Sequence, residues 1–273
     1  IIGDATGAGT ISDNDSVAFT VTTPTSNVNE NGMTHDVEVT ATLSVLGAVG
    51  NAGLDQTISV DLARTGGTAN PTNPEADFTY ATSTLSFSAA DGDGTSFQKD
   101  ATLAIHEDIV DDDAETIILQ VQNLVDGSSG QASIGGANTH TVTINDDDTA
   151  SEANFDVPTG SGNVLVQING LNLEIVVGGV VQSAAPVATI TDLNLTGPAD
   201  GSTISLDVSS GSLPASISVD GGGQDTLEIT GSGSNATIAY DGTDAQDGTV
   251  SIDGITVAYD DIPNNTLVIT GTN

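Results

Sequence analysis

Cysteine is absent, basic residues are almost absent, and aromatic residues are few. The 273 residues contain no Cys, no Trp, five Phe, three Tyr and only two basic residues, Arg64 and Lys99. Without Cys there is no disulfide, no thiolate metal site and no Cys nucleophile. Two basic residues cannot neutralise a phosphate backbone, which excludes nucleic acid as a partner.

Long apolar runs are also missing. No stretch approaches the roughly 18 apolar residues that a membrane-spanning helix needs, and the negative charge opposes binding to an acidic lipid surface. We therefore expect no direct membrane insertion. The formal net charge is −36. The carboxylates therefore repel one another unless divalent cations bind or the medium is saline. Both conditions point to an extracellular or cell-surface protein.

The residues that are abundant favour strands throughout. Gly, Thr, Ser, Asp and Val are mediocre or poor helix formers. Apolar and polar residues alternate with period two in residues 17–22, 36–43 and 141–145, and Gly, Asn, Asp and Pro clusters separate such runs. Short alternating strands with turn signals predict an all-β chain that begins with an antiparallel sandwich.

An internal similarity divides the chain. Residues 2–15 resemble residues 134–148, since both read as a Gly-rich turn, a strand ending in Thr-Ile and an acidic triplet. We therefore expect a donor or linker strand over 1–15 that resembles the end of a preceding repeat, a sandwich over 16–149 and a second all-β domain over 150–273. Asp13-Asn14-Asp15 is either a linker turn or a ligand group that needs partners from elsewhere.

Four motifs occur in a fixed order in the first half: Val28-Asn-Glu30; Gly67-Thr-Ala-Asn with Ala76-Asp-Phe-Thr-Tyr80; Glu107-Asp-Ile-Val-Asp-Asp-Asp-Ala-Glu-Thr116; and Thr143-Ile-Asn-Asp-Asp-Asp148. With these motifs, residues 16–148 resemble a Calx-beta domain, the module of the regulatory loop of sodium–calcium exchangers that also recurs in bacterial surface proteins. The resemblance implies an immunoglobulin-like sandwich with an acidic central strand from Glu107, and it implies Ca²⁺ as the bound ion.

The resemblance also implies a set of calcium ligands. These are Glu30, Asp77, Asp108, the carbonyl of Val110, Asp112, Asp146, Asp147 and Asp148. Asp112 stands where the family more often has Glu, which shortens the reach of that ligand. Ca²⁺ prefers hard oxygen ligands, and crowded carboxylates repel one another without a cation. The alternative is that the acidic runs are solvated loops, as we expect for Asp111 and Asp113.

The second half is more regular and lacks basic residues. The phrase Leu-x-Leu/Ile-Thr-Gly recurs at Leu193, Leu227 and Leu267. A loose repeat in a strand-rich sequence indicates a β-solenoid, and a second β-sandwich is the alternative. The glycine-rich stretch from Asp220 to Leu227 is either a tight turn or a single copy of a calcium-binding glycine repeat.

These observations favour a structural protein rather than an enzyme. No His pair has the spacing of a helical metal motif, and no Gly-x-Ser-x-Gly occurs. We expect a calcium-stabilised fibre, filament, sheath or adhesin stalk, a homopolymer joined head to tail by sheet stacking or by strand exchange through residues 1–15. The alternatives are an adhesion module that binds a glycan or a surface protein, with the sandwich as spacer, and a calcium sensor of the exchanger type.

Overall fold

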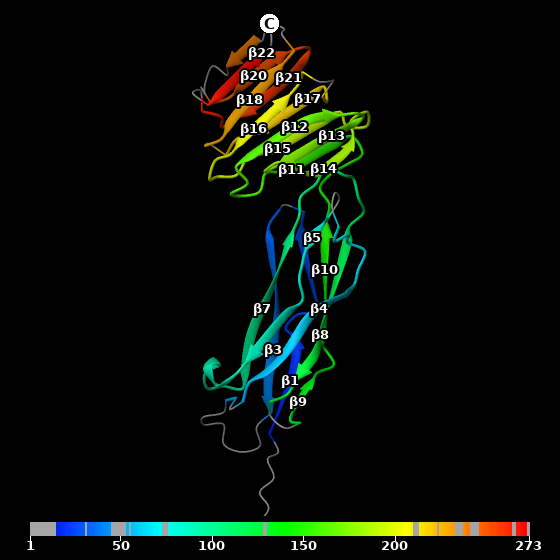
Figure 1. The fold of residues 1–273 in the computed structure, drawn as a ribbon, viewed down its shortest axis with the longest axis vertical. Helices are drawn as coiled ribbons and strands as arrows, with labels where there is room; N and C mark the ends of the chain where they lie inside the picture. Colours follow the sequence, from blue (N-terminus) through cyan, green and yellow to red (C-terminus); the bar gives the residue numbers. More distant parts are fainter. Residues whose placement is uncertain are drawn as a thin grey trace, which may run out of the picture.

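The computed structural model shows two β-rich units arranged end to end (Figure 1). It describes residues 15–30, 32–44, 53–54, 56–72, 76–127, 130–209, 213–222, 224–232, 237–240, 246–263 and 266–271. Strands β1 to β10 form the first unit, named the sandwich, and β11 to β22 form the second, named the solenoid. Among the described residues, no helix has the length and apolar character needed to cross a membrane. Of the leading strand expected over residues 1–15, only Asp15 is described.

Two five-stranded sheets build the sandwich. The first has the order β5–β7–β3–β1–β9, with β1 (Ser16–Val21), β3 (Thr34–Ser44), β5 (Phe78–Thr79), β7 (Ser96–Ile105) and β9 (Ala132–Ile134). The second has the order β2–β10–β8–β4–β6, with β2 (Thr25–Asn29), β4 (Ile58–Gly66), β6 (Ser83–Phe87), β8 (Glu115–Val125) and β10 (Thr139–Asn145). A short 3-10 turn, η1 (Ala89–Asp91), follows β6.

The alternating pattern of the sequence explains the core of the sandwich. In β3, Val37, Val39 and Ala41 point inward and are buried. Phe19 and Phe87, from opposite sheets, meet with their ring centroids 5.2 Å apart. Among the described strands of the sandwich, two pairs at the sheet edges are parallel, β1 with β9 and β2 with β10. The other pairs of the sandwich are antiparallel, as expected.

Two six-stranded sheets build the solenoid. One has the order β11–β15–β17–β21–β20–β19, with β11 (Glu152–Asp156), β15 (Asp192–Thr196), β17 (Ser216–Asp220), β19 (Thr237–Tyr240), β20 (Gly248–Ile252) and β21 (Ile255–Asp260). The other has the order β14–β13–β12–β16–β18–β22, with β12 (Asn163–Asn169), β13 (Asn172–Val177), β14 (Val180–Pro186), β16 (Thr203–Asp207), β18 (Thr226–Gly231) and β22 (Leu267–Gly271).

The chain winds through the solenoid in coils. Each coil contributes one strand to each sheet, in parallel with the strand of the coil before it. Val164, Ile204, Leu227 and Leu267 lie in register at intervals of 40, 23 and 40 residues. The short interval is a bare coil, and each long one also contains a hairpin, β13–β14 or β19–β20. This topology is that of a solenoid and not of a second antiparallel sandwich.

The glycine-rich run from Asp220 to Leu227 is a corner of the solenoid between β17 and β18. A Cβ on Gly221 would lie 2.2 Å from Cδ1 of Ile262 in the next coil, so coil stacking requires glycine there. The Asp220 carboxylate accepts the Gly222 N–H at 3.1 Å. These contacts agree with a tight turn rather than a calcium-binding repeat.

The two units touch through the loop that joins β7 to β8. Ile109 belongs to the buried core of the solenoid, and Val110 packs against that core. The Ile109 N–H also donates to the buried Oγ of Ser183 on β14, at 3.1 Å. The acidic run from Glu107, expected as a strand, is therefore a loop that docks on the second unit.

Candidate metal site

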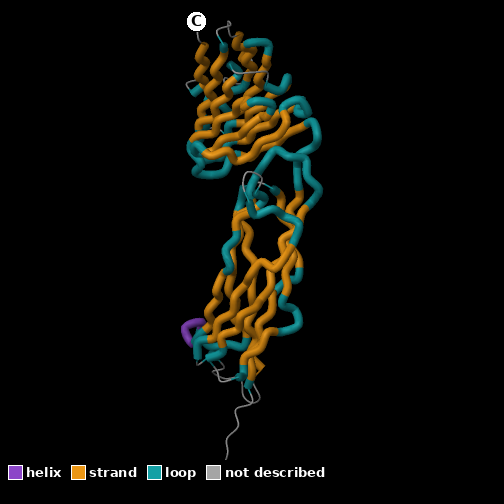
Figure 2. The backbone as a smooth tube through the Cα atoms, turned by 45° about the vertical axis from the view of Figure 1, so that its right-hand side comes forward, coloured by secondary structure: helices purple, strands orange, loops and turns teal. Residues whose placement is uncertain are grey.

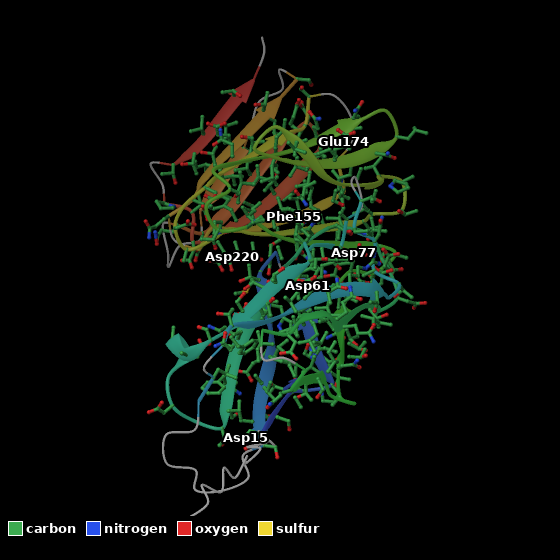
Figure 3. The ribbon with its side chains drawn as sticks, turned by 60° about the horizontal axis from the view of Figure 1, so that its bottom comes forward. Asp15, Asp61, Asp77, Phe155, Glu174 and Asp220 are labelled. Atoms are coloured by element: carbon green, nitrogen blue, oxygen red, sulfur yellow. The ribbon has the colours of Figure 1, made fainter. Side chains whose placement is uncertain are left out.

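Acidic side chains gather at the end of the sandwich that faces the solenoid. Figure 3 shows Asp77 at this end and Asp15 at the opposite one. The segments that contribute are the ends of β2 and β10, the start of β5, the start of β8 and the loop from β7 to β8. This group is named the acidic apex, and its members are Glu30, Asp77, Glu107, Asp108, Asp112, Asp113, Glu115, Asp146, Asp147 and Asp148.

Strand pairing brings these distant segments together. Because β2 and β10 pair in parallel and end together, Glu30 and Asp146 leave the sheet side by side. The Glu30 N–H donates to the carbonyl of Asn145 at 3.0 Å. In the other sheet β5 pairs with β7, and the Asp77 carbonyl accepts the His106 N–H at 2.8 Å. Asp77 is thus held beside the start of the acidic loop.

A small pocket opens within the acidic apex. It is lined by Glu30, Asp77, Asp112, Asp113, Glu115, Ile144 and Asp146. All of these but Ile144 are carboxylates, the ligands that Ca²⁺ prefers. Asp113, expected to face only solvent, is exposed and also lines this pocket.

The other predicted ligands, Asp108, Val110, Asp147 and Asp148, do not line this pocket. Asp146, Asp147 and Asp148 place carboxylate oxygens within 4.8 Å of one another. Asp108 is buried, and its Oδ1 accepts the Val110 N–H at 2.8 Å. The side chain of Val110 itself turns toward the core of the solenoid. The fold therefore brings the four predicted acidic clusters to one end of the sandwich.

Burial raises the pKa values of these carboxyls. The pKa of Glu30 rises to about 9, first by burial and then by the negative charges around it, that of Asp108 foremost. Burial also raises the pKa of Asp148 to about 8 and that of Asp108 to about 6, although each accepts a backbone hydrogen bond that acts in the opposite direction. The ionised forms of these groups are therefore costly unless a cation is close.

In the described part of the chain, neither basic side chain forms a salt bridge with a carboxylate of the apex. Lys99 forms a salt bridge with Asp91 of η1, with Nζ and Oδ1 2.5 Å apart, at the end of the sandwich far from the solenoid (Figure 2). Arg64 donates to the carbonyl of Ala69 at 2.8 Å and lies over the Phe78 ring, 5.1 Å from its centroid. Neutralising the apex therefore requires protons or a bound cation.

Two carboxylates of the apex escaped prediction from the sequence. Glu115 opens β8, and burial together with a hydrogen bond to Asp77 raises its pKa to about 8. Glu107 is only 2 % exposed, and burial raises its pKa to about 10. Their only signal in the sequence is membership of the acidic run, because composition cannot separate a buried carboxylate from a solvated one.

The polar atoms left without a partner fit a bound metal. Oδ2 of Asp148 is buried and makes no hydrogen bond, and Glu107 is buried with only the backbone of Asp156 as a hydrogen-bonding neighbour. Burying a carboxylate without a partner costs on the order of several kcal/mol, which a coordinated cation removes. Because the donor set consists of oxygens alone, it suits a hard ion such as Ca²⁺ rather than a metal that prefers nitrogen or sulfur.

Comparison with known proteins adds solved structures only. No protein-family model matches the chain, and no curated protein matches it. The apo-form CBD1 domain of Calx is 19% identical over 49% of this chain and 99% of its own length, with a TM-score of 0.36. CBD12 from CALX1.2 is 20% identical over 60% of this chain, with a TM-score of 0.37. The calcium binding domain CBD12 of CALX1.1 is 19% identical over 58%, with a TM-score of 0.36.

The chain spans 57% and 55% of the lengths of the two CBD12 structures. The sandwich consists of two five-stranded sheets, in agreement with the immunoglobulin-like sandwich that its motifs predict. With identities this low, the chemistry of the acidic apex rests on its own residues and not on these likenesses.

Proposed function

We propose that the chain is a calcium-binding structural module of an extracellular or cell-surface protein. Ca²⁺ bound at the acidic apex would neutralise the carboxylates and stiffen the end of the sandwich on which the solenoid sits. The observation that carries this proposal is the pocket lined by six carboxylates at this end of the sandwich, with the buried and unpaired Oδ2 of Asp148 close to it. The net charge of −36 supports a medium rich in salt and divalent ions.

We further propose that the module is a repeating part of a fibre, filament, sheath or adhesin stalk, built by head-to-tail strand exchange or sheet stacking. The end-to-end arrangement of the two units supports an elongated part (Figure 1). β22 pairs in parallel with β18, and β18 with β16, so each coil of the solenoid receives the next by parallel strand pairing. An edge strand can accept a further strand. A contribution of residues 1–15 remains an expectation.

The proposal is not enzymatic. One serine is hydrogen-bonded to two histidines: Ser26 Oγ lies 2.8 Å from Nε2 of His35 and 2.8 Å from Nε2 of His140. His140 is 2 % exposed, and its Nδ1 lies 2.6 Å from the carbonyl of Thr23. Because Ser26 and His140 belong to one sheet and His35 to the other, we assign these hydrogen bonds to linking the two sheets of the sandwich.

The test of the proposed function is calcium binding followed by assembly. Equilibrium dialysis of the full chain at neutral pH with excess Mg²⁺ should show bound Ca²⁺, and the double variant Glu30→Gln with Asp77→Asn should bind less. The matched control, Glu174→Gln with Asp192→Asn in the solenoid, should bind as the unchanged chain does. Electron microscopy should show polymers in Ca²⁺ that shorten or dissolve in chelator. Absence of calcium binding would overturn the proposal.

A second candidate function is an adhesion module, with the sandwich as a calcium-stiffened spacer. The observation in its favour is two separate exposed apolar side chains at opposite ends of β13, Leu171 (83% exposed) and Val180 (59% exposed). Such side chains suit a protein surface better than a glycan, which aromatic residues usually stack against. A chain that stays monomeric in Ca²⁺ yet binds a surface, and loses that binding in Leu171→Ser, would favour this function over assembly.

A further inference from the structure

Two histidines meet at one serine inside the sandwich. Oγ of Ser26 on β2 lies 2.8 Å from Nε2 of His35 on β3 and 2.8 Å from Nε2 of His140 on β10. Both imidazoles point inward, since His35 alternates along β3 in step with the buried Val37, and His140 along β10 in step with the buried Val142. Because β3 belongs to one sheet and β10 to the other, the serine joins the two layers.

The hydrogen bonds of this group run in one direction. Nδ1 of His140 lies 2.6 Å from the carbonyl of Thr23, and a carbonyl can only accept, so the proton of the neutral ring is on Nδ1. Nε2 of His140 is then an acceptor and receives the Ser26 O–H, which leaves the Ser26 oxygen to accept the Nε2–H of His35. The neutral forms of both rings therefore satisfy the whole series of hydrogen bonds.

His140 also holds the point at which the chain changes sheets. Thr23 lies between β1 of the first sheet and β2 of the second. The imidazole of His140 thus bonds this crossover through one nitrogen and Ser26, three residues further on, through the other. β2 pairs with β10 at the edge of its sheet and leads directly into Glu30, which lines the pocket of the acidic apex. The histidine pair therefore helps to fix a strand that carries part of the pocket wall.

A proton added to this group breaks the order of its hydrogen bonds. Protonated His140 donates through both nitrogens, so the Ser26 O–H loses its acceptor. A second proton, on His35, places two positively charged rings against one oxygen that lies 2.8 Å from each Nε2, and the two charges repel each other. Ser26 and His35 are only partly buried, so protons can reach the group from solvent.

The charged groups on the surrounding strands do little to offset that positive charge. β1 and β2 carry no titratable residue, and β10 carries His140 alone. Asp36 favours protonated His35, but burial first and then the charge of His140 outweigh it and lower the pKa of His35 from its ordinary value of 6.5. The other charged residues of these strands are Glu38 on the outer face of β3, Asp100 on the outer face of β7, Lys99 of β7 in its salt bridge with Asp91, and Glu115 at the apex end of β8.

We infer that Ser26, His35 and His140 form an acid-sensitive latch between the two sheets, closed while both imidazoles are neutral and opened when they are protonated. The latch goes beyond calcium binding, because it needs no metal and its residues are not in the pocket lining. A histidine whose pKa is lowered by folding contributes stability that is present above its unfolded pKa and is lost as the pH falls below 6.5. Acid therefore loosens the start of β2, whereas it relieves repulsion between the carboxylates of the apex.

The test measures hydrogen exchange of residues 22–29 in the metal-free full chain at about pH 7.5 and about pH 5, on either side of the ordinary histidine pKa. The unchanged chain is compared with Ser26→Ala, which removes the shared hydroxyl, after correction for the intrinsic exchange rate at each pH. The ratio of the two protection factors cancels the titration of the apex, whose carboxyls are the same in both chains. His106→Gln is the matched control, because its ring also bonds a hydroxyl, Oγ1 of Thr79 on the adjacent strand, at 2.9 Å.

At about pH 7.5 the unchanged chain should be protected on the order of tenfold more than Ser26→Ala, because the variant loses two hydrogen bonds. At about pH 5 this ratio should fall several-fold toward one. His35→Gln keeps a donor for Ser26 but cannot titrate, so its protection should fall less with acid, and His106→Gln should match the unchanged chain at both pH values. A ratio that is equal at both pH values, or close to one at both, would overturn the latch. Because no metal is present, either result leaves the proposed function standing.

Discussion

The sandwich and the solenoid are both acidic, but they hold their carboxylates differently. In the solenoid, Glu174 accepts a hydrogen bond from Gln167 at 3.1 Å, and Glu228 accepts one from Ser205 at 3.1 Å, on the outer faces of the sheet. In the sandwich, several carboxyls gather at one end, and burial raises the pKa values of Glu30, Asp108 and Asp148. The solenoid has a single described carboxyl of this kind, Asp225, whose Oδ2 is also buried without a hydrogen-bond partner. The candidate site is therefore located by the gathering of buried carboxyls and not by the number of acids.

The two units also differ in how their cores are built. The sandwich closes one core between two sheets whose strands come from distant parts of the chain, as Phe19 and Phe87 show. The solenoid adds one layer per coil. Leu227 is in register with Ile204 of the preceding coil and with Leu267 of the following coil. Cooperativity should accordingly be global in the sandwich and local in the solenoid.

The largest expected effects come from cavities in these two cores. Phe87→Ala should cost the sandwich about 3–5 kcal/mol, and Leu227→Ala should cost the solenoid about 2–5 kcal/mol. In hydrogen exchange, Phe87→Ala should weaken protection across the whole sandwich, whereas Leu227→Ala should weaken β16, β18 and β22 before β11 and β12. Uniform loss of protection over both units in either variant would contradict the difference in cooperativity.

Removal of calcium should give the next largest difference between the thermal stabilities of the two units. At free Ca²⁺ one hundred times the dissociation constant, one bound ion stabilises by about 2.7 kcal/mol, which corresponds to roughly 10 °C for a domain of this size. Chelator should lower the thermal transition of the sandwich by that order and leave that of the solenoid nearly unchanged. Scanning calorimetry assigns the transitions with the two cavity variants. An equal shift of both transitions would place calcium in both units.

The part of the fold that the sequence predicted is the part that local alternation encodes. Period-two runs located strands in both units, but they carry no information on which sheet a strand joins. Leu227 and Leu267 do stack in register, whereas Leu193 lies in the opposite sheet, where it pairs with Ile217. The repeated phrase therefore found one true coil interval and one false one, because inward and outward residues alternate alike in both sheets.

The acidic clusters of the candidate site were predictable from the sequence, but their arrangement in space was not. The acidic clusters stand out in the sequence, and the parallel pairing of β2 with β10 that joins Glu30 to Asp146 could come only from the structure. Glu107 looks like any member of an acidic run until its burial is known. The docking of the acidic loop on the solenoid through Ile109 is likewise encoded by no local pattern.

A smaller effect is expected from pH, and its sign is set by the raised pKa values. A carboxyl with a raised pKa in the folded state contributes stability that is fully present below its unfolded pKa and is lost as the pH rises through its folded pKa. With values of about 6 for Asp108, about 8 for Asp148 and about 9 for Glu30, the calcium-free sandwich should lose stability from about pH 5 to pH 9.

Melting curves in chelator from pH 5 to pH 9 measure this slope. In Ca²⁺ the slope should flatten or reverse, because the metal binds the ionised carboxylates and releases their protons. The solenoid is the internal control. Among its described carboxyls, only Asp225 has a raised pKa; burial raises it, and the hydrogen bond from the Ser202 N–H acts in the opposite direction. The thermal transition of the solenoid should therefore move less with pH. A sandwich that gains stability with pH in chelator would contradict the burial of its charges.

The smallest effects on stability should come from replacing one carboxyl by an amide in each unit. Glu174→Gln, on the outer face of the solenoid (Figure 3), should change stability by less than about 0.5 kcal/mol with or without calcium. Glu30→Gln should also change little in chelator at neutral pH, because an amide replaces a carboxyl whose pKa of about 9 already keeps it protonated. In Ca²⁺ the stabilities of the two variants should differ, because only Glu30→Gln removes a carboxylate oxygen from the lining of the pocket. A loss of stability in Glu30→Gln that is equal in chelator and in Ca²⁺ would mean that this carboxyl serves packing alone.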